Sequence, residues 1–134
     1  GHSIGDAVLC QTGRLMQRCC RAHDVVARLG GDEFAVVFWD LPERPHPRDD
    51  RRSDHRDHPG QAEFMAERFR REMSEADFEC LGPSGRGTLT ISGGLATFPR
   101  DAKTAEDLYE KADQAMLQAK KTGKNKITIV GKTT

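Results

Sequence analysis

The sequence has no net charge, no long hydrophobic run and no recognisable signal peptide. Its 21 basic and 21 acidic side chains cancel, which argues against a general electrostatic attraction to nucleic acid or to a membrane surface. No apolar run is long enough to span a bilayer. At 134 residues the chain has room for one domain with a single core. We therefore expect one cytoplasmic domain over residues 1–134, alone or as the cytoplasmic part of a membrane-anchored protein, with no nucleic-acid or membrane contact.

The four cysteines lack the spacing of a zinc site or a redox pair. Cys10, Cys19, Cys20 and Cys80 form no Cys-x-x-Cys motif. Cys19 and Cys20 are adjacent, and Cys10 falls on the same expected helix. We therefore expect four reduced thiols, partly buried, in a cytosolic protein.

Residues 41–60 differ in composition from the rest of the chain. This stretch has almost no apolar residues, but it contains four of the six prolines and three of the five histidines. Such a segment cannot bury enough apolar surface to offset the entropy of ordering it, which predicts a polar, mobile insertion. Its histidines, His46, His55 and His58, have no regular ligand spacing, so we do not expect a metal site there.

The stretch around Gly30-Gly31-Asp32-Glu33 has the pattern of a hairpin with an unusual tip. Apolar or aromatic runs at 25–29 and 34–39 flank it, which predicts two strands. The two glycines allow positive φ and leave no side chain in the way of a ligand. Asp32 and Glu33 follow directly. A bare backbone beside two carboxylates suits a nucleotide phosphate bridged by a divalent cation, although an ordinary polar turn has the same letters.

The remaining pattern predicts an α+β fold, a sandwich with a mostly antiparallel sheet and helices packed on it. Apolar residues recur at helical spacing in three segments, and Thr104 with Asp107 forms a capping-box-like start for the last of them. We expect helices over 5–21, 61–76 and 104–122, a second hairpin from strands at 78–81 and 88–98, and a final strand at 126–130.

Five stretches together resemble the GGDEF domain of diguanylate cyclases over nearly the whole chain. They are Gly30-Gly31-Asp32-Glu33-Phe34, Gly1-His2-Ser3-Ile4-Gly5-Asp6, Arg21-Ala22-His23-Asp24, residues 90–96 and residues 112–125. The resemblance implies a palm-like nucleotide-cyclase fold. It also implies a bacterial signalling transferase that condenses two GTP molecules into cyclic di-GMP and releases pyrophosphate. The alternative that remains open is a catalytically silent GGDEF module that senses GTP or cyclic di-GMP.

The resemblance assigns the catalytic centre to the hairpin tip. Asp32 and Glu33 would be the catalytic and metal-binding carboxylates, for two Mg²⁺ ions or Mn²⁺ in their place. The backbone of Gly30 and Gly31 would lie against the GTP phosphates. Because each domain binds one GTP, activity implies a homodimer, driven by a regulatory domain outside this segment.

Four further residues would bind the substrate according to the same resemblance. His2 and Asp6 would line the guanosine pocket, where a carboxylate accepts hydrogen bonds from guanine that adenine lacks. Lys120 and Lys124 would contact the β- and γ-phosphates. Each has a simpler interpretation, because an acid at a helix start and a lysine at a helix end both favour the helix dipole.

The resemblance also implies an inhibitory product site formed by Arg21, Asp24 and Arg68. An arginine can bind phosphate or a guanine edge with two hydrogen bonds, and a carboxylate can accept from guanine. In the simpler interpretation, Arg21 is a cation at a helix end, Asp24 is a loop residue and Arg68 lies on a solvated helix face.

The family pattern includes one strand that this sequence lacks. In the family, a first strand upstream of the Gly-His-x-x-Gly-Asp motif carries a metal-binding Asp. The sequence begins at Gly1, inside that motif. We therefore expect an N-terminally truncated domain that is inactive by itself, because metal-assisted phosphoryl transfer needs carboxylates from two neighbouring strands.

Overall fold

The structure, a computed structural model, describes residues 3–40 and 59–132. Its helices and strands confirm the α+β class. In chain order they are α1 (Ile4–Cys19), β1 (Val25–Gly30), β2 (Glu33–Val37), α2 (Pro59–Glu75), the 3₁₀ helix η1 (Glu79–Leu81), β3 (Ser92–Leu95), α3 (Ala105–Lys121) and β4 (Lys126–Ile129). None of the helices in these ranges is long and apolar enough to cross a membrane.

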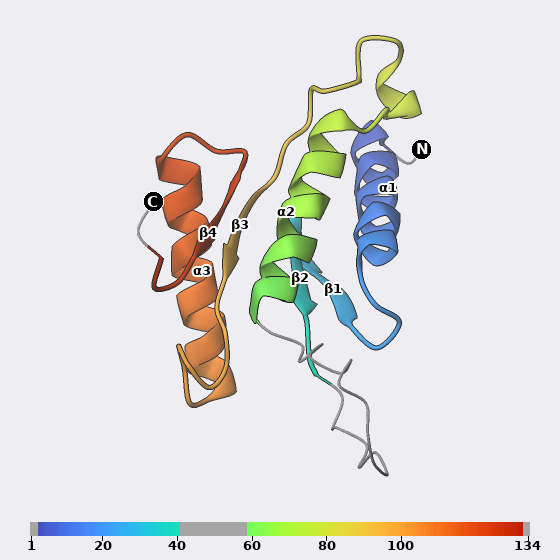
Figure 1. Cartoon of the computed structure of the whole chain (residues 1–134). Helices are drawn as coiled ribbons and strands as arrows, with labels where there is room; N and C mark the ends of the chain where they lie inside the picture. The colour runs from blue at the N-terminus through green and yellow to red at the C-terminus, as the bar shows by residue number, and fades with distance from the viewer. Residues whose placement is uncertain (1–2, 41–58, 133–134) are drawn as a thin grey trace, which may run out of the picture.

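Helices α1 and α2 lie side by side on the hairpin formed by β1 and β2 (Figure 1). The hairpin is antiparallel, as expected, with Val26 opposite Val36. Leu15 and Met16 of α1 meet Phe69 of α2 in a buried cluster, against which the inward side chains of both strands pack. The predicted helical faces account for this core. Phe64 of α2, however, is 64% exposed and lies outside this cluster.

The C-terminal third forms a second unit in which β3, α3 and β4 follow one another. Strands β3 and β4 pair in parallel, and α3 connects them. Gly94 allows α3 to pack directly on β3, because a Cβ atom there would lie 1.9 Å from the carbonyl oxygen of Ala112. The facing side of α3 is correspondingly small, with Ala115 and Ala119 buried.

The expected second hairpin is wrong. Residues 79–81 form the 3₁₀ helix η1, and the only strand between residues 82 and 104 is β3. Phe78 is completely buried and draws the chain inward just before η1. The glycine-rich segment after it folds into turns that begin at Gly82, where φ is 75°. Strand β3 therefore pairs with the strand that follows α3 instead of with a neighbour across the turn.

The helix ends agree closely with the sequence pattern. Ser3 accepts a hydrogen bond from the backbone of Asp6 at the start of α1, and Thr104 accepts one from Asp107 at the start of α3. Residues 41–58 of the expected insertion, including its three histidines, lie outside the described residues. Helix α2 begins at Pro59, two residues before the expected start of that helix at residue 61.

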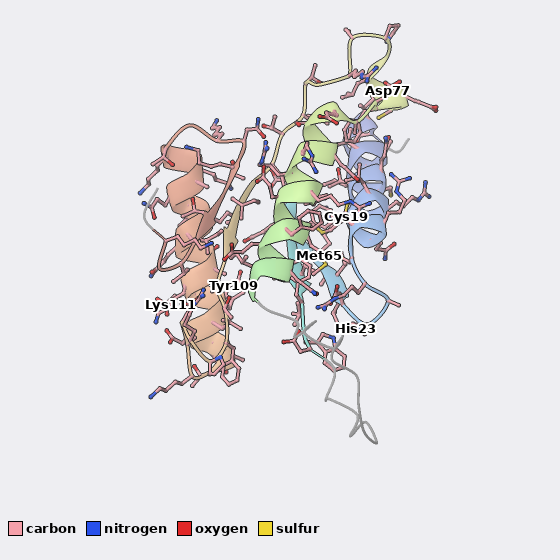
Figure 2. All side chains as sticks on the ribbon, in the orientation of Figure 1. Cys19, His23, Met65, Asp77, Tyr109 and Lys111 are labelled. Carbon is pink, nitrogen blue, oxygen red and sulfur yellow. The ribbon has the colours of Figure 1, made fainter. Side chains whose placement is uncertain are left out.

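The two units leave a groove of about 2020 Å³ between them. Within residues 3–40 and 59–132, β2 pairs only with β1 and β3 pairs only with β4. Residues of both β2 and β3 line the groove, so each sheet has an unpaired edge beside it. Several large apolar side chains of the groove wall are exposed to solvent: Leu29, Val37, Trp39, Phe98, Tyr109 and Leu117. Figure 2 shows Tyr109 on the side of α3 that faces this groove.

Candidate functional site

The hairpin tip leaves its backbone open to solvent. Gly30 and Gly31 have φ values of 152° and 53°, and a Cβ atom on either would meet nothing within 4 Å. The strand register shifts between Arg28 and Gly30, which forms a bulge just before the turn. Arg28 then donates a hydrogen bond from Nε to the carbonyl oxygen of Gly31 at 2.9 Å. The turn is therefore held from one side while its glycines remain accessible to a ligand.

Asp32 and Glu33 carry the only carboxylates of this turn. Asp32 is exposed, whereas Glu33 is half-buried and opens β2. Both line the groove. Carboxylate oxygens are the ligands that Mg²⁺ takes in proteins, and it is often held by one or two of them together with substrate phosphates. The pair therefore fits a divalent cation that also binds a phosphate. In the described part of the chain, no three His, Cys, Asp or Glu side chains gather closely enough to hold a metal by themselves.

The groove brings the expected phosphate ligands to the same cavity as the carboxylates. Lys120 and Lys124 line it from the end of α3, while Asp32 and Glu33 line it from the hairpin. Gly5, at the start of α1, also lines it, whereas the neighbouring Asp6 is exposed beside it. His2 lies outside the described residues. A cavity with acids on one wall and lysines on another is complementary to a metal-bound polyphosphate.

The turn after α3 has an unusual backbone conformation. Gly123, Lys124 and Asn125 have φ values of 120°, 60° and 48° in succession. The amide of Lys124 bonds back to the carbonyl oxygen of Ala119 at 3.0 Å, which ends the helix as the sequence predicted. Left-handed conformations are unfavourable for lysine, so the surrounding contacts must hold Lys124 in place.

Arg21 and Asp24 form a closed pair at the corner between α1 and β1. The Asp24 carboxylate accepts hydrogen bonds from the Arg21 backbone amide at 2.8 Å, from Nε at 3.2 Å and from Nη2 at 3.1 Å. The Asp24 side chain is completely buried. Burial alone would raise the pKa of this carboxyl, but the hydrogen bonds and charge of Arg21 outweigh it, and the pKa lies below its usual range. Arg21 and Asp24 therefore form a buried, hydrogen-bonded ion pair, whereas the simpler interpretation expected an isolated loop carboxylate near a cation at the helix end.

Trp39 and His23 enclose the same corner. The Trp39 indole donates from Nε1 to the carbonyl oxygen of His23, and the two rings meet edge to face at 5.6 Å. Arg21 also donates to the carbonyl oxygen of Trp39 at 3.3 Å. Figure 2 places His23 at this end of the hairpin, away from α3. Trp39, which follows β2, is thus hydrogen-bonded to the turn that contains Arg21 and Asp24.

Arg68, the third residue of the expected product site, lies on α2. It pairs with Glu72 at 3.1 Å, and Glu72 in turn accepts a hydrogen bond from the thiol of Cys19 at 3.1 Å. Burial and then the bond to Glu72 raise the pKa of Cys19 to about 12. All four cysteines are free thiols, as expected, and Cys10 is exposed. Arg68 is thus linked through Glu72 to Cys19 at the end of α1, two residues before Arg21.

The comparison with known families identifies the domain. The family model described as "Diguanylate cyclase, GGDEF domain" matches residues 1–51 and 53–126. The chain belongs to this family. Solved GGDEF structures share its fold: the domain of YfiN from Pseudomonas aeruginosa gives a TM-score of 0.74 at 27% identity, covering 99% of this chain and 72% of that one. The active GGEEF domain of a diguanylate cyclase from Vibrio cholerae gives 0.71 at 26%, with the same coverage.

Curated relatives of the GGDEF domain are considerably longer proteins. Diguanylate cyclase A of Treponema denticola is 29% identical over 129 residues, which cover 96% of this chain and 30% of that protein. The response regulator PleD of Caulobacter vibrioides is 31% identical over 132 residues, covering 98% of this chain and 25% of that protein. The chain thus spans less than a third of the length of these relatives.

Three contacts around the site were not predicted from the sequence. These are the bond from Arg28 to Gly31, the Trp39–His23 pair and the bond from Arg70 to Asn125. The position of Arg28, two residues before Gly30, was the one available signal, since a long side chain there can reach back over a two-glycine turn. The other contacts depend on how the hairpin and α2 pack.

Proposed function

We propose that this GGDEF domain binds GTP and catalyses the condensation of two GTP molecules into cyclic di-GMP. The observation that carries the proposal is the groove, where Asp32 and Glu33 at an open Gly-Gly turn share one cavity with Lys120 and Lys124. A turn without side chains lets a triphosphate approach the backbone. The lysines offset the negative charge of the β- and γ-phosphates, and the carboxylates offer oxygen ligands to the cation that accompanies them.

The proposed chemistry needs two domains facing each other. The 3′-hydroxyl oxygen of each GTP bonds to the α-phosphorus of the other, the bond to the β-phosphate breaks, and pyrophosphate leaves. Asp32 accepts the hydroxyl proton, and Glu33 supports the geometry of the hairpin. A bound Mg²⁺ or Mn²⁺ pair would stabilise the charge that develops on the phosphate oxygens. Asp6, at the start of α1, would accept hydrogen bonds from guanine.

The groove is too large for a nucleotide alone. Ordinary small-molecule pockets have volumes of roughly 300–1,000 Å³, whereas this one is about 2020 Å³ and is bordered by two unpaired sheet edges. We propose that an additional strand, from polypeptide outside these 134 residues, occupies the apolar part of the groove between β2 and β3. That strand would supply a further metal-binding carboxylate beside those of Asp32 and Glu33.

We further propose that Arg21 and Asp24 form a product-inhibition site with Arg68. Support comes from the order of the corner, where Asp24 is buried against Arg21 and both are fixed by neighbouring backbone. The Arg21 side chain remains 24% exposed, so the preformed pair can present guanidinium donors to a phosphate or to a guanine edge. Arg68, 46% exposed on the adjacent helix, has room to turn toward the same ligand.

Nucleotide selectivity tests the proposed GTP site. The chain is titrated calorimetrically with GTP and with ATP in the presence of Mg²⁺, for the wild type and for Asp6→Asn. We expect GTP to bind more tightly, and Asp6→Asn to weaken GTP binding about tenfold or more, with ATP unaffected. Glu75→Gln, which changes the acid at the last residue of α2, is the matched control. Equal affinity of the wild type for GTP and ATP would refute the site.

A further inference from the structure

One side chain connects the turn that contains Lys124 to the other wall of the groove. Arg70 of α2 donates a hydrogen bond from Nη1 to Oδ1 of Asn125 at 3.0 Å. Fifty-five positions separate the two residues in the chain. The bond therefore crosses from the unit of α1, α2 and the hairpin to the unit of β3, α3 and β4.

Arg70 is itself held rigidly. Glu67, one helical turn earlier, accepts from Nε at 2.9 Å and 3.0 Å and from Nη2 at 2.5 Å. The Arg70 side chain is 21% exposed. A planar guanidinium fixed along one edge by a carboxylate can present its remaining nitrogen in only one direction. In this structure that direction is toward Asn125.

The receiving turn needs such support. Lys124 and Asn125 are the only non-glycine residues in the described ranges with a positive φ. Asparagine tolerates this conformation better than lysine does, and strained residues of this kind persist only where their surroundings fix them. The bond to Arg70 fixes the Asn125 side chain, and with it the backbone that follows Lys124.

The contact links two parts of the candidate site. Phe69, the neighbour of Arg70, belongs to the buried cluster against which Phe34 packs, and Phe34 directly follows Glu33 in β2. The path from Glu33 to Asn125 therefore consists of the packing of Phe34 on the Phe69 cluster, the helix backbone between Phe69 and Arg70, and the hydrogen bond from Arg70 to Asn125. It ends one residue away from Lys124.

We propose that Arg70 is a positioning residue for triphosphate binding, acting through Asn125 to hold Lys124 at the groove that Asp32 and Glu33 also line. This inference rests on the proposed function, because it takes Lys124 to bind the phosphates. Arg70 itself touches neither substrate nor metal. Its loss should loosen the turn and weaken the contact with phosphate while leaving recognition of the guanosine part unchanged.

The test combines two binding ligands with a double-mutant cycle. GTP with Mg²⁺ and guanosine, which has no phosphate, are titrated into the wild type, Arg70→Ala, Lys124→Ala and the double variant. We expect Arg70→Ala to weaken GTP binding about tenfold, as for loss of one charge-assisted phosphate contact. Guanosine affinity should not change. In the Lys124→Ala background, Arg70→Ala should have no further effect.

A matched pair at Asn125 separates positioning from stability. Asn125→Gly keeps the positive φ but removes the acceptor, so it should reproduce the effect of Arg70→Ala. Asn125→Asp keeps an acceptor and should retain GTP affinity. Lys132→Met is the control, because it removes another contact from α2 to the C-terminal unit, the Lys132–Glu63 ion pair, at a site remote from the turn.

Hydrogen exchange at the Lys124 amide gives a readout that does not depend on GTP. This amide bonds to Ala119, and Arg70→Ala should speed its exchange severalfold while leaving the amides in the middle of α3 unchanged. Unchanged exchange, or a loss of GTP affinity that persists in the Lys124→Ala background, would overturn the role of Arg70. A third outcome separates the two proposals. If the wild type binds no GTP but Arg70→Ala still speeds exchange at Lys124, the proposed function is wrong. The Arg70–Asn125 bond would then stabilise the turn without a role in triphosphate binding.

Discussion

Arg21 donates hydrogen bonds to the carboxylate of Asp24 from both its guanidinium and its own backbone amide. This single residue pair connects the two ends of the turn between α1 and β1. Because the Asp24 side chain is completely buried, its charge depends on Arg21 for compensation. The Arg-x-x-Asp motif therefore has a structural role in this fold, whether or not it also binds a ligand.

Removing the Asp24 charge should change how stability depends on pH. The folded-state pKa of Asp24 is lowered, so its contribution is fully present above the unfolded value of about 3.9. This contribution is lost as the pH falls through the folded pKa. We expect Asp24→Asn to be less stable than the wild type at pH 7, and the difference to shrink below about pH 4. Urea unfolding of the wild type and Asp24→Asn at pH 7 and pH 3 measures the stability difference at each pH. A stability difference that is the same at both values would contradict a lowered pKa for Asp24.

Cyclic di-GMP binding distinguishes the two roles of Arg21. If Arg21 forms a product site, Arg21→Ala should weaken cyclic di-GMP binding about ten- to a hundredfold, the effect of losing a charge-assisted hydrogen bond worth roughly 1.5–3 kcal/mol. Calorimetric titration of the wild type and the variant decides the question. Arg28→Ala, which removes an arginine bonded to Gly31 at the hairpin tip, serves as the control. Equal affinities for Arg21→Ala and the wild type would leave this corner with a structural role only.

Two glycine substitutions should have opposite effects on stability. In Gly94→Ala, the new Cβ would lie 1.9 Å from the Ala112 carbonyl oxygen and 2.5 Å from the Met116 amide, so α3 must move away from β3. We expect a loss of about 3 kcal/mol. In Gly13→Ala, within α1, the nearest atom is a Phe34 ring carbon at 3.8 Å, an ordinary contact. That change should stabilise by about 0.5–1 kcal/mol. Thermal and urea unfolding of the two variants provide the comparison.

The cysteines should differ sharply in reactivity. Cys19 is buried and bonded to Glu72, and its pKa of about 12 keeps the thiol protonated at pH 8. Cys10 is exposed. We expect iodoacetamide to modify Cys10 in the folded protein and to reach Cys19 only after unfolding, as mapped by peptide mass spectrometry. Glu72→Gln should leave Cys19 protected by burial. Rapid labelling of Cys19 in the folded wild type would show that α1 and α2 do not pack as described.

The local elements could be predicted from the sequence because short-range chemistry determines them. The Gly30-Gly31 turn and the Thr104 cap depend on residues within three positions of each other, and the structure has both. The prediction of a second hairpin was wrong because long-range packing determines which strand pairs with β3. Two β-prone segments around a Gly-Pro turn looked like partners, but the burial of Phe78 and the fit of α3 on Gly94 pair β3 with β4.

The candidate site was only partly predictable for the same reason. The family motifs named Asp32, Lys120 and Lys124, and the groove brings these residues together. The motifs could not reveal the bond between Arg70 and Asn125, because it depends on the packing of α2 against the C-terminal unit. Nor could they show that the groove has two unpaired sheet edges.

The most direct test of the cyclase proposal is cyclic di-GMP formation from GTP, followed by chromatography in the presence of Mg²⁺. We compare this 134-residue chain with a longer polypeptide that includes the preceding segment, each with and without Asp32→Ala. We expect product only from the longer polypeptide with Asp32 intact, because the proposed mechanism needs a carboxylate from the additional strand as well as Asp32. Product from the 134 residues alone, or undiminished turnover after Asp32→Ala, would contradict it.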